Sequence, residues 1–302
     1  MKFEVLINDT IENLIPDSGI VNAAKIHLVS MINDFEDGKW RFEKFQDTIW
    51  NNVGLTALSV RERDSLYGEP MSIMKAAAQN LRIIKDDAYG SGSEIAEILL
   101  YAVMSHHHNA LPVVPKLFYK QNANDPAKGA DSVHIVLEGD DFSLWFGESK
   151  FFNSIEDVRL YEVINSVIES LGTGKLKKEN SIITNLSDLH EIGIEEGLKN
   201  KIIEFLKPSE SIDKIKPKLH IPIMLLNECI ITQNQIDISD KYKEDIVEFH
   251  KDRAKSYFTK LLKKLSKVHL FEEITFHLII IPVFKKQPIV EGFNETAKFL
   301  KK

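Results

Sequence analysis

Apolar and polar positions follow two different periods along the chain, and the changes of period mark the expected elements. Where apolar residues recur every three or four positions, they form one face of an amphipathic helix. Short runs that are rich in β-branched and aromatic residues and end in turn residues predict strands. The expected helices cover 71–85, 94–104, 155–171 and 241–266, with a polar helical stretch from about 181 to 206, and the expected strands cover 111–119, 131–137, 142–150, 220–226 and 274–283.

Glycine-rich and polar stretches separate these elements. Residues 89–93 predict a break, with Ser93 as the cap of the helix that follows. Residues 121–129 and 172–180 predict loops, the second of which is rich in glycine and lysine. The order helix, strand, strand, strand, helix, strand across 94–226 therefore predicts an α/β fold, with a mixed β-sheet flanked by helices on both faces.

The clearest turn in the sequence is Glu138-Gly139-Asp140-Asp141, and its chemistry favours a β-hairpin between the two runs beside it. If the two central residues form the loop, Asp131 lies directly opposite Glu148, with β-carbons about 4.5–5.5 Å apart. Side chains alternate between the faces of a strand, so Lys150 shares a face with Glu148 and Asp131. One local turn therefore brings two carboxylates and an ammonium together.

These three charges stand at the end of an otherwise apolar strip, which is not a normal packing choice. Two facing carboxylates repel each other and are tolerated when a divalent cation lies between them. Mg²⁺ takes oxygen ligands, and a neighbouring lysine can orient or deprotonate water or stabilise a phosphodiester in its transition state. We therefore expect a Mg²⁺ site, with Mn²⁺ as an alternative ion. The apolar positions of the strip are Val133, Ile135, Leu137, Phe142, Leu144 and Phe146.

The same residues resemble the signature of the PD-(D/E)xK nuclease superfamily. Asp131 is followed, after sixteen intervening residues, by Glu148-Ser149-Lys150, and Ala130 stands where the pattern often has proline. The helix expected over 94–104 resembles the first helix of that superfamily, which often supplies another acidic residue. The resemblance implies a restriction-endonuclease-like fold and metal-dependent hydrolysis of phosphodiester bonds.

Three segments resemble the HamA family more narrowly, namely residues 96–101, 128–134 and 145–150. HamA is the nuclease component of the Hachiman antiphage defence system. The resemblance is strongest between about residues 90 and 170, and it implies a Mg²⁺-dependent DNA nuclease that a partner helicase, HamB, holds in check. The alternative is a non-catalytic subunit of the same fold, which binds and regulates a helicase or DNA.

The resemblance also implies roles for the residues of the motif. Asp131 and Glu148 would ligate the metal ion, with the Ser149 carbonyl as a further ligand. Lys150 would handle the attacking water or the charge of the transition state.

A fourth acidic residue is expected from the preceding helix, where Glu94 and Glu97 are both candidates. We favour Glu97, because a small residue followed by glutamate fits the HamA pattern best. It would bind a metal-bound water or a second ion. For either residue alone, a glutamate of a solvated helix face is an equal alternative.

The composition and net charge say less about the function than the motif does. The formal net charge is −7, which gives mild evidence against DNA binding, because nucleic-acid-binding proteins are usually basic. The segment 251–267 is locally cationic and is a candidate DNA contact or docking surface, with a solvated amphipathic helix as the alternative. The single cysteine, the lack of a signal-peptide pattern and apolar runs too short for a membrane span predict a cytoplasmic protein.

Other motifs in the sequence give weaker evidence for a functional site. Consecutive helix residues point 100° apart, so His106-His107-His108 is expected to be a helix-end cluster and not a metal site. Gly172-Thr173-Gly174-Lys175 lacks the residues that a phosphate-binding loop needs on either side, although Lys175, Lys177 and Lys178 remain candidate phosphate contacts. His134 and Trp145 are expected on the hairpin face opposite Asp131, and Cys229 in the core.

The length of 302 residues allows one large domain or two small ones. We expect residues 1–89 to form an N-terminal α/β segment packed on the core. Residues 90–302 are expected to form the nuclease domain, elaborated at its C-terminal end by helices and a strand.

Overall fold

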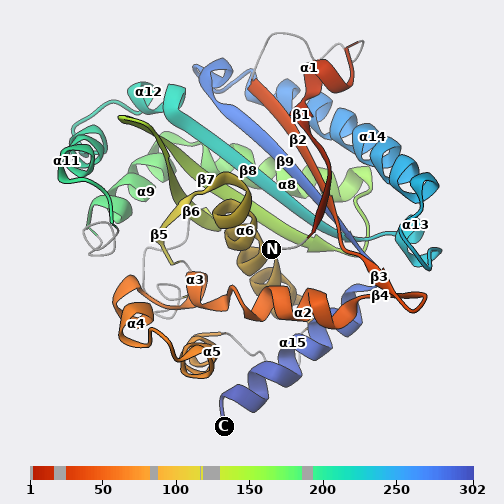
Figure 1. Ribbon diagram of the computed structural model, residues 1–302. Helices are drawn as coiled ribbons and strands as arrows, with labels where there is room; N and C mark the ends of the chain where they lie inside the picture. The colour runs from red at the N-terminus through yellow and green to blue at the C-terminus, as the bar shows by residue number, and fades with distance from the viewer. Residues whose placement is uncertain (1–2, 17–24, 82–87, 116, 118–129, 186–192) are drawn as a thin grey trace.

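A seven-stranded mixed sheet forms the centre of the molecule, as seen in a computed structural model (Figure 1). The structure describes residues 3–16, 25–81, 88–115, 117, 130–185 and 193–302, with the backbone alone for 88–91. Along the sheet the strands are β1 (Glu4–Thr10), β2 (Lys25–Ile32), β9 (Thr275–Val283), β8 (Leu219–Glu228), β7 (Asp141–Phe152), β6 (Ser132–Glu138) and β5 (Leu111–Val114). A separate two-stranded hairpin consists of β3 (Phe35–Glu36) and β4 (Lys39–Trp40).

The four middle strands, β2, β9, β8 and β7, run parallel to one another. Antiparallel strands extend this unit at both edges, with β1 beside β2 and with β6 and β5 beyond β7. Parallel strands need helices to cover both of their faces. The near-continuous apolar sequences of β8 and β9 fit that environment, because every residue of β9 is buried.

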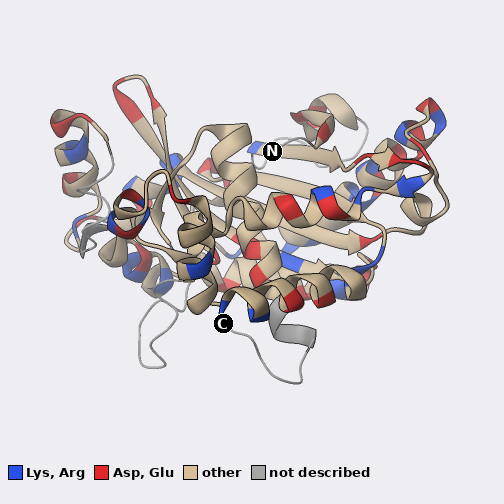
Figure 2. Ribbon diagram, turned by 60° about the horizontal axis from the view of Figure 1, so that its bottom comes forward, with Lys and Arg blue, Asp and Glu red and all other residues tan. Residues whose placement is uncertain are grey.

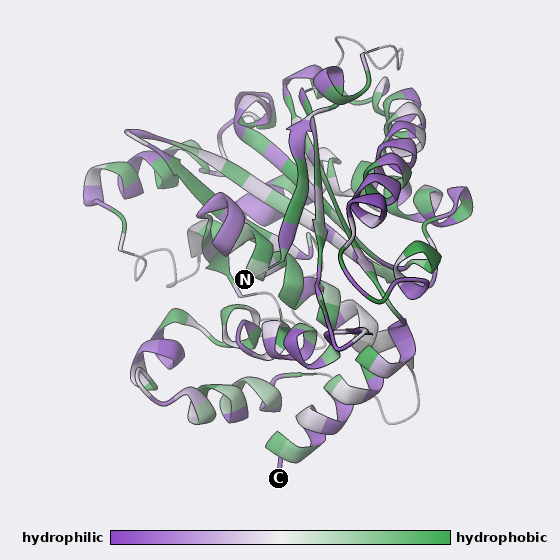
Figure 3. Ribbon diagram, turned by 45° about the vertical axis from the view of Figure 1, so that its right-hand side comes forward, coloured by the Kyte–Doolittle hydropathy of each residue, from purple (hydrophilic) through white to green (hydrophobic). Residues whose placement is uncertain are grey.

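Helices form a layer on each face of the sheet. On one face, an apolar cluster joins the sheet to α8 (Asp157–Ser170), α9 (Thr173–Asn185), α11 (Glu196–Phe205) and α14 (Asp240–Leu265). On the other face, a second cluster joins it to α2 (Phe42–Trp50), α3 (Val53–Ala57), α5 (Pro70–Gln79), α6 (Ala88–His108) and α15 (Lys286–Leu300). Figure 3 shows the matching distribution, with hydrophobic residues along the strands and on one side of the helices. The α/β fold predicted from the sequence, a mixed sheet between helices, is confirmed.

Short helices complete the described chain. They are α1 (Ile11–Leu14), α4 (Val60–Ser65), α12 (Ile212–Ile215), α13 (Ile230–Gln233) and the 3₁₀ turns at Lys216–Lys218 and Phe271–Glu273. Within the described ranges, none of the helices combines the length and the apolar character that a membrane span requires.

The break expected over 89–93 is wrong, because α6 begins at Ala88 and continues through this stretch. Ser93 is therefore a helix-interior residue and not a cap. Glycine disfavours helix when a segment stands alone. Here α6 is almost completely buried from Glu94 to Met104, and this tertiary packing outweighs the local preference.

The loop expected over 172–180 is also wrong, because α9 begins at Thr173 and runs to Asn185. Leu176 and Ile183 are buried in the core, and they anchor one side of this helix. The lysines that suggested a loop lie mostly on its outer side. A helix in which only two aliphatic residues are buried and most others are polar has a weak apolar period. The sequence pattern alone therefore does not reveal it.

The helix expected over 155–171 is confirmed as α8, but its buried face differs in part from the expected one. Ile164 and Val167 are buried as expected, whereas Val158 is 73% and Tyr161 45% exposed. The stretch expected to be helical from about 181 to 206 corresponds to the end of α9 and to α11, with the non-helical residues 193–195 before α11. The strand expected over 111–119 ends at Val114 as β5. The remaining expected elements are present with shifted ends, and the loop expected over 121–129 lies outside the described residues.

The first ninety residues contribute directly to the central sheet. β2 lies between β1 and β9 and pairs with β9 in parallel from Lys25 opposite Thr275 to Ser30 opposite Ile280. The helices α2, α3 and α5 cover the same face as α6 and α15 (Figure 1). Strands from the two ends of the sequence therefore lie side by side in one sheet.

Candidate active site on the β6–β7 hairpin

The β6–β7 hairpin has the register predicted from its turn. Ser132 pairs with Gly147, and the pairing continues without a shift to Glu138 and Asp141. Gly139 has a φ of +64°, a conformation that glycine adopts without the strain that other residues incur. Extending the register by one residue places Asp131 opposite Glu148.

The hairpin brings the three charged residues of the motif together. The Lys150 Nζ donates to Glu148 Oε1 at 2.5 Å and lies 3.9 Å from Asp131 Oδ2. Asp131 Oδ2 also accepts from the Ser149 backbone N–H at 3.0 Å and from the Ser149 hydroxyl at 3.3 Å. The exposed fractions of the side chains are 15% for Asp131, 9% for Glu148 and 33% for Lys150. The site is thus recessed, and its ammonium end reaches solvent.

Burial and charge shift the protonation equilibria of two of these groups. Burial raises the pKa of Glu148, and the negative charge of Asp131 raises it further, against the opposing effects of Lys150 and Ser166. Burial alone would lower the pKa of Lys150, but Asp131 and Glu148 outweigh burial and raise it. The site therefore has more negative than positive charge, and it stabilises a cation strongly.

Two residues outside the hairpin complete the surroundings of Glu148. The Ser166 hydroxyl on α8 donates to Glu148 Oε1 at 2.6 Å. Tyr257 on α14 is fully buried, and the charge of Glu148 adds to burial in raising its pKa. The sequence analysis missed both residues, because neither stands in a motif and each reaches the hairpin only through helix packing.

The structure separates the two helix glutamates. Both are buried, at 5% exposed for Glu94 and 3% for Glu97. Glu97 is among the charges that raise the pKa of Lys150, whereas Glu94 acts on Lys301 near the end of the chain. Glu97, which we favoured on the sequence pattern, is therefore the glutamate whose charge acts on Lys150.

The donor set suits a hard divalent cation. Asp131 and Glu148 supply two carboxylates, and Ser149, which directly follows Glu148, lies close to Asp131 through its backbone N–H. Mg²⁺ is typically held by one or two carboxylates and keeps several waters. In the described residues no group of three His, Cys, Asp or Glu side chains is placed to hold a metal, so a site here would rely on two carboxylates, backbone oxygen and water. The shared ammonium of Lys150 already shows that both carboxylates turn toward one cation.

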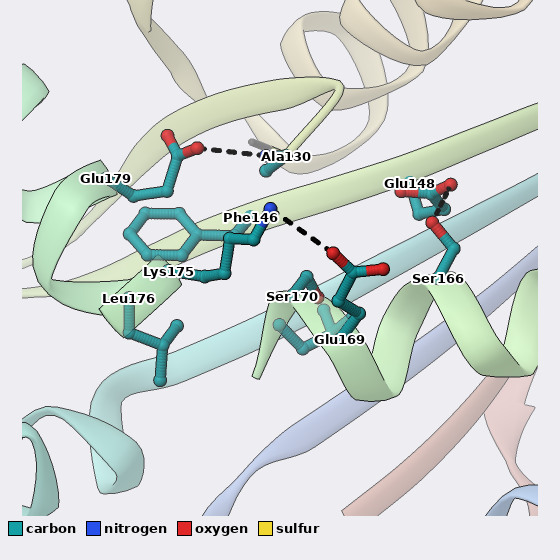
Figure 4. Close-up of a pocket in the computed structure, with 10 residues that line it drawn as sticks. Ala130, Phe146, Glu148, Ser166, Glu169, Ser170, Lys175, Leu176 and Glu179 are labelled. Atoms are coloured by element: carbon teal, nitrogen blue, oxygen red, sulfur yellow. Dashed lines mark hydrogen bonds and ion pairs between the residues drawn. The ribbon is translucent and has the colours of Figure 1, made fainter. Parts of the chain in front are cut away.

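A pocket of about 310 Å³ adjoins Glu148 between the hairpin and the helices α8 and α9 (Figure 4). Glu148 and Ser166 lie at one end and Phe146, Leu176 and Glu179 at the other. The Lys175 Nζ lies 3.3 Å from Glu169 Oε1. The remaining lining residues are Ala130, Ser170 and Ile221.

The opposite face of the sheet carries a row of rings, which we call the histidine row: His27, His277, His220, Trp145 and His134, of which the first four are stacked. His27 and His277 are paired in register, as are Trp145 and His220, and His134 and Trp145. Ring centroids are 4.9 Å apart for His27 and His277 and 4.3 Å for Trp145 and His277. His134 and Trp145 thus face away from Asp131, as expected.

The three consecutive histidines end α6, as expected for a helix-end cluster. His108 contacts the histidine row through Trp145, with ring centroids 4.7 Å apart, and His106 contacts Asn52 at 3.1 Å. Cys229 is buried. None of these residues lies near the hairpin carboxylates on the other face.

The cationic helix expected over 251–267 is the second half of α14, and part of its charge is directed at α8. Asp157 lies 2.9 Å from Lys260 and 3.5 Å from Arg253. Lys264 bonds to Asn165 and lies over the ring of Tyr161. These contacts neutralise part of the cationic face. In Figure 2 the charged residues lie mostly on helices and turns, with both signs interspersed, while the strands carry few of them.

Comparison with known proteins gives one family for nearly the whole chain. The family model described as HamA matches residues 7–297. No curated protein matches the chain.

Proposed function

The chain belongs to the HamA family, and from that premise we propose that this component of Hachiman antiphage defence is a Mg²⁺-dependent DNA nuclease. The observation that carries the proposal is the convergence of Asp131, Glu148 and Lys150 at one end of an apolar hairpin face, with Lys150 Nζ within 4 Å of both carboxylates. A purely structural role would not require two acidic groups to be recessed side by side, because their repulsion destabilises the fold.

Asp131, Glu148 and the Ser149 carbonyl would hold the metal ion, and Glu97 of α6 would bind a metal-bound water or a second ion. When bound, Mg²⁺ would activate water and neutralise the charge that develops on the phosphodiester. Lys150 has a raised pKa, so it carries a proton at neutral pH and serves as a donor to the phosphate oxygens. We therefore assign Lys150 to stabilising the transition state and not to removing a proton from water.

The test is DNA cleavage by the purified chain with Mg²⁺ or Mn²⁺, on linear, circular and single-stranded DNA, and on RNA as a comparison. We expect Asp131→Asn, Glu148→Gln and Lys150→Ala to reduce cleavage about 100-fold or more, with circular dichroism unchanged. Lys75→Ala, at an exposed position of α5 on the other face of the sheet, is the matched control and should cleave like the wild type. Normal cleavage by Lys150→Ala would show that the motif is accidental. If the wild type does not cleave any of these substrates, alone or with its partner, the alternative of a non-catalytic regulatory subunit is the better account.

We further propose that the chain works in a complex with a helicase, HamB. A defence component that cleaves DNA must be restrained in its host, and the net charge of −7 gives the chain little attraction to DNA by itself. No phosphate-binding loop stands at 172–175, where α9 begins, so ATP use would belong to the helicase. The exposed lysines Lys255 and Lys263 of α14, together with Lys267 two residues beyond its end, offer a docking or DNA-contact surface.

The partner proposal is tested by co-purifying the chain with a helicase encoded beside it. DNA degradation is then measured for the isolated chain and for the complex, with and without ATP and DNA ends. We expect a stable complex that degrades DNA only after the helicase is engaged. Equal degradation by chain and complex at physiological salt, or the failure of a complex to form, contradicts restraint by the helicase and leaves the nuclease proposal standing.

A further inference from the structure

Another pocket lies beyond the carboxyl ends of the central parallel strands, and it shares none of its described lining residues with the pocket beside Glu148. β8 and β9 are parallel neighbours. The chain leaves β8 through α13 for α14 on one face of the sheet, and it leaves β9 for α15 on the other face. In open α/β sheets, ligands bind in the crevice where the connections change sides in this way. The β3–β4 hairpin, which follows β2, lines the same crevice (Figure 1).

The pocket has the size and the walls of a small-molecule site. Its volume is about 440 Å³, within the range of roughly 300–1,000 Å³ that such sites occupy. Phe42 and Phe284 line it and are partly exposed, and Ile236 beside them is 67% exposed. The tip of the Phe42 ring is packed against α15, because a β-carbon at Gly292 would lie 3.0 Å from its Cζ. The pocket therefore offers accessible apolar surface on side chains that the fold positions.

The charge of this pocket is opposite to that of the catalytic hairpin. None of the described residues that line it is acidic, although the protein has a net charge of −7. Lys39 and Lys285 line it, both are exposed, and neither forms an ion pair within the described part of the chain. Glu36 faces Lys39 in the backbone register of the β3–β4 hairpin, but its carboxylate lies 3.4 Å from Arg41. The pocket therefore attracts an anion.

Two glutamines supply hydrogen-bonding groups. The Gln233 Nε2 donates to the Phe284 carbonyl at 2.6 Å, which ties the segment after β8 to the segment after β9. Gln235 also lines the pocket and is partly exposed, and its side chain makes no hydrogen bond within the described residues. A glutamine amide both donates and accepts, so it can bond to the edge of a nucleic-acid base.

We propose that this pocket binds a nucleoside phosphate. The base lies against Phe42, Phe284 and Ile236, since aromatic rings are the surfaces on which single bases stack. The glutamine amide bonds to the edge of the base, and the two lysines bind the phosphate as point charges. A free nucleotide and the phosphorylated end of a nucleic-acid strand present the same groups. The inference does not depend on the proposed nuclease function, because the acidic hairpin contributes no residue to this pocket.

Isothermal titration calorimetry of the full chain, without divalent cations, measures the affinity for 5′-AMP, adenosine and inorganic phosphate. Ile236→Asp places a negative charge on the pocket wall. Ile230→Asp is the matched control, because Ile230 is 66% exposed and is not among the lining residues. Lys285→Ala removes one partner of the phosphate. Its control is Lys298→Ala, which removes an exposed lysine near the other end of α15.

We expect 5′-AMP to bind at least about 10-fold more tightly than adenosine or inorganic phosphate, because only the nucleotide makes both sets of contacts. Lys285→Ala should weaken 5′-AMP binding at least about 10-fold, as the loss of one charge-assisted hydrogen bond does. Ile236→Asp should weaken it at least as much, because its charge repels the phosphate. Both controls should bind like the wild type, with equal melting temperatures for all four variants.

No binding of 5′-AMP, equal binding of 5′-AMP and inorganic phosphate, or unchanged binding by Ile236→Asp overturns the proposal. A 5′-phosphorylated DNA oligonucleotide separates the two sources of the ligand. Displacement of bound 5′-AMP at a lower concentration than unlabelled 5′-AMP requires identifies a strand end. Displacement only at a higher concentration, or none, identifies the free nucleotide.

Discussion

Gly147 stands one residue before Glu148, at a point where β7 has no room for a side chain. A β-carbon there would lie 2.2 Å from the Ser132 Oγ and 2.7 Å from the Leu100 Cδ2. We expect Gly147→Ala to lower the free energy of unfolding by about 1–3 kcal/mol, as overpacked core substitutions do. Gly174 in α9 has nothing within 4 Å of such a carbon, and Gly174→Ala should stabilise the chain by roughly 0.5–1 kcal/mol. Urea unfolding measures both, and changes of the same sign would contradict this account of Gly147.

Ser166 is the residue that orients Glu148 from α8. Its hydroxyl donates to the carboxylate at 2.6 Å, and outer partners of metal-binding carboxylates typically contribute 10- to 100-fold to metal affinity or activity. We expect Ser166→Ala to raise the Mg²⁺ concentration needed for half-maximal cleavage about 10-fold. Ser166→Thr keeps a hydroxyl and should reverse part of this increase. Ser170→Ala is the control. Ser170 lies one turn further along α8, and its hydroxyl donates to the Val167 backbone carbonyl and not to Glu148. An unchanged Mg²⁺ titration curve for Ser166→Ala would limit this serine to a packing role.

The predictable residues of the site are those that a local turn places. Asp131, Glu148 and Lys150 follow from the alternation of a strand and from one two-residue loop, so the sequence was sufficient. Ser166 and Tyr257 come from α8 and α14, whose approach to the hairpin depends on packing between distant segments. Nothing in the local pattern around either residue distinguishes it from an ordinary helix residue.

At the scale of elements, the histidine row is a pH-sensitive part of the sheet. His134 is fully buried, and neither of its ring nitrogens has a hydrogen-bond partner within the described residues. Burial lowers the pKa of His134 to about 3 and that of His220 to about 4. Below pH 6.5 the unfolded chain takes up protons at these residues that the folded chain does not. The free energy of unfolding therefore falls as the pH decreases from about 6.5 toward 3–4.

His134 alone should contribute a loss of about 1.4 kcal/mol between pH 7.5 and pH 5.5, since one pH unit below the unfolded pKa corresponds to that energy. His134→Phe removes the titration, so the variant should lose about that much less than the wild type over the same interval. Chemical denaturation at the two pH values measures the difference. His269→Phe, at a residue whose side chain is 75% exposed, should leave the pH dependence as it is. Equal losses in the wild type and in His134→Phe would show that His134 is already protonated in the folded chain.

Elements with a strong apolar period were predicted well, and those held by long-range packing were not. β8, β9 and α14 have long apolar patterns, and their observed bounds lie within one or two residues of the expected ones. The start of α6 contains glycines that disfavour helix, and α9 has few apolar residues, so the local signal in each case favoured a loop. In both, burial against neighbouring elements decides the conformation.

At the scale of the whole molecule, the central sheet depends on the first ninety residues. Removal of residues 1–87 would delete β2, expose the edge of β9, and uncover the apolar face that α2, α3 and α5 protect. We expect the truncated chain to lack a cooperative thermal unfolding transition, because it exposes an unpaired, highly apolar strand. Co-expression of the missing segment as a separate chain should restore the transition. A truncated chain that unfolds cooperatively would instead support an independent domain from residue 88 onward.

The pairing of β2 with β9 also determines the order in which the chain acquires structure during synthesis. His27 and His277 are neighbours in the sheet, so β2 leaves the ribosome about 250 residues before its partner strand exists. The β6–β7 hairpin, whose strands are adjacent in sequence, forms within the intervening time, and contacts between distant segments form last. The acidic hairpin is therefore expected to form on the nascent chain before β9 joins the sheet. The sheet that supports the candidate site is in this way closed only after β9 has been synthesised.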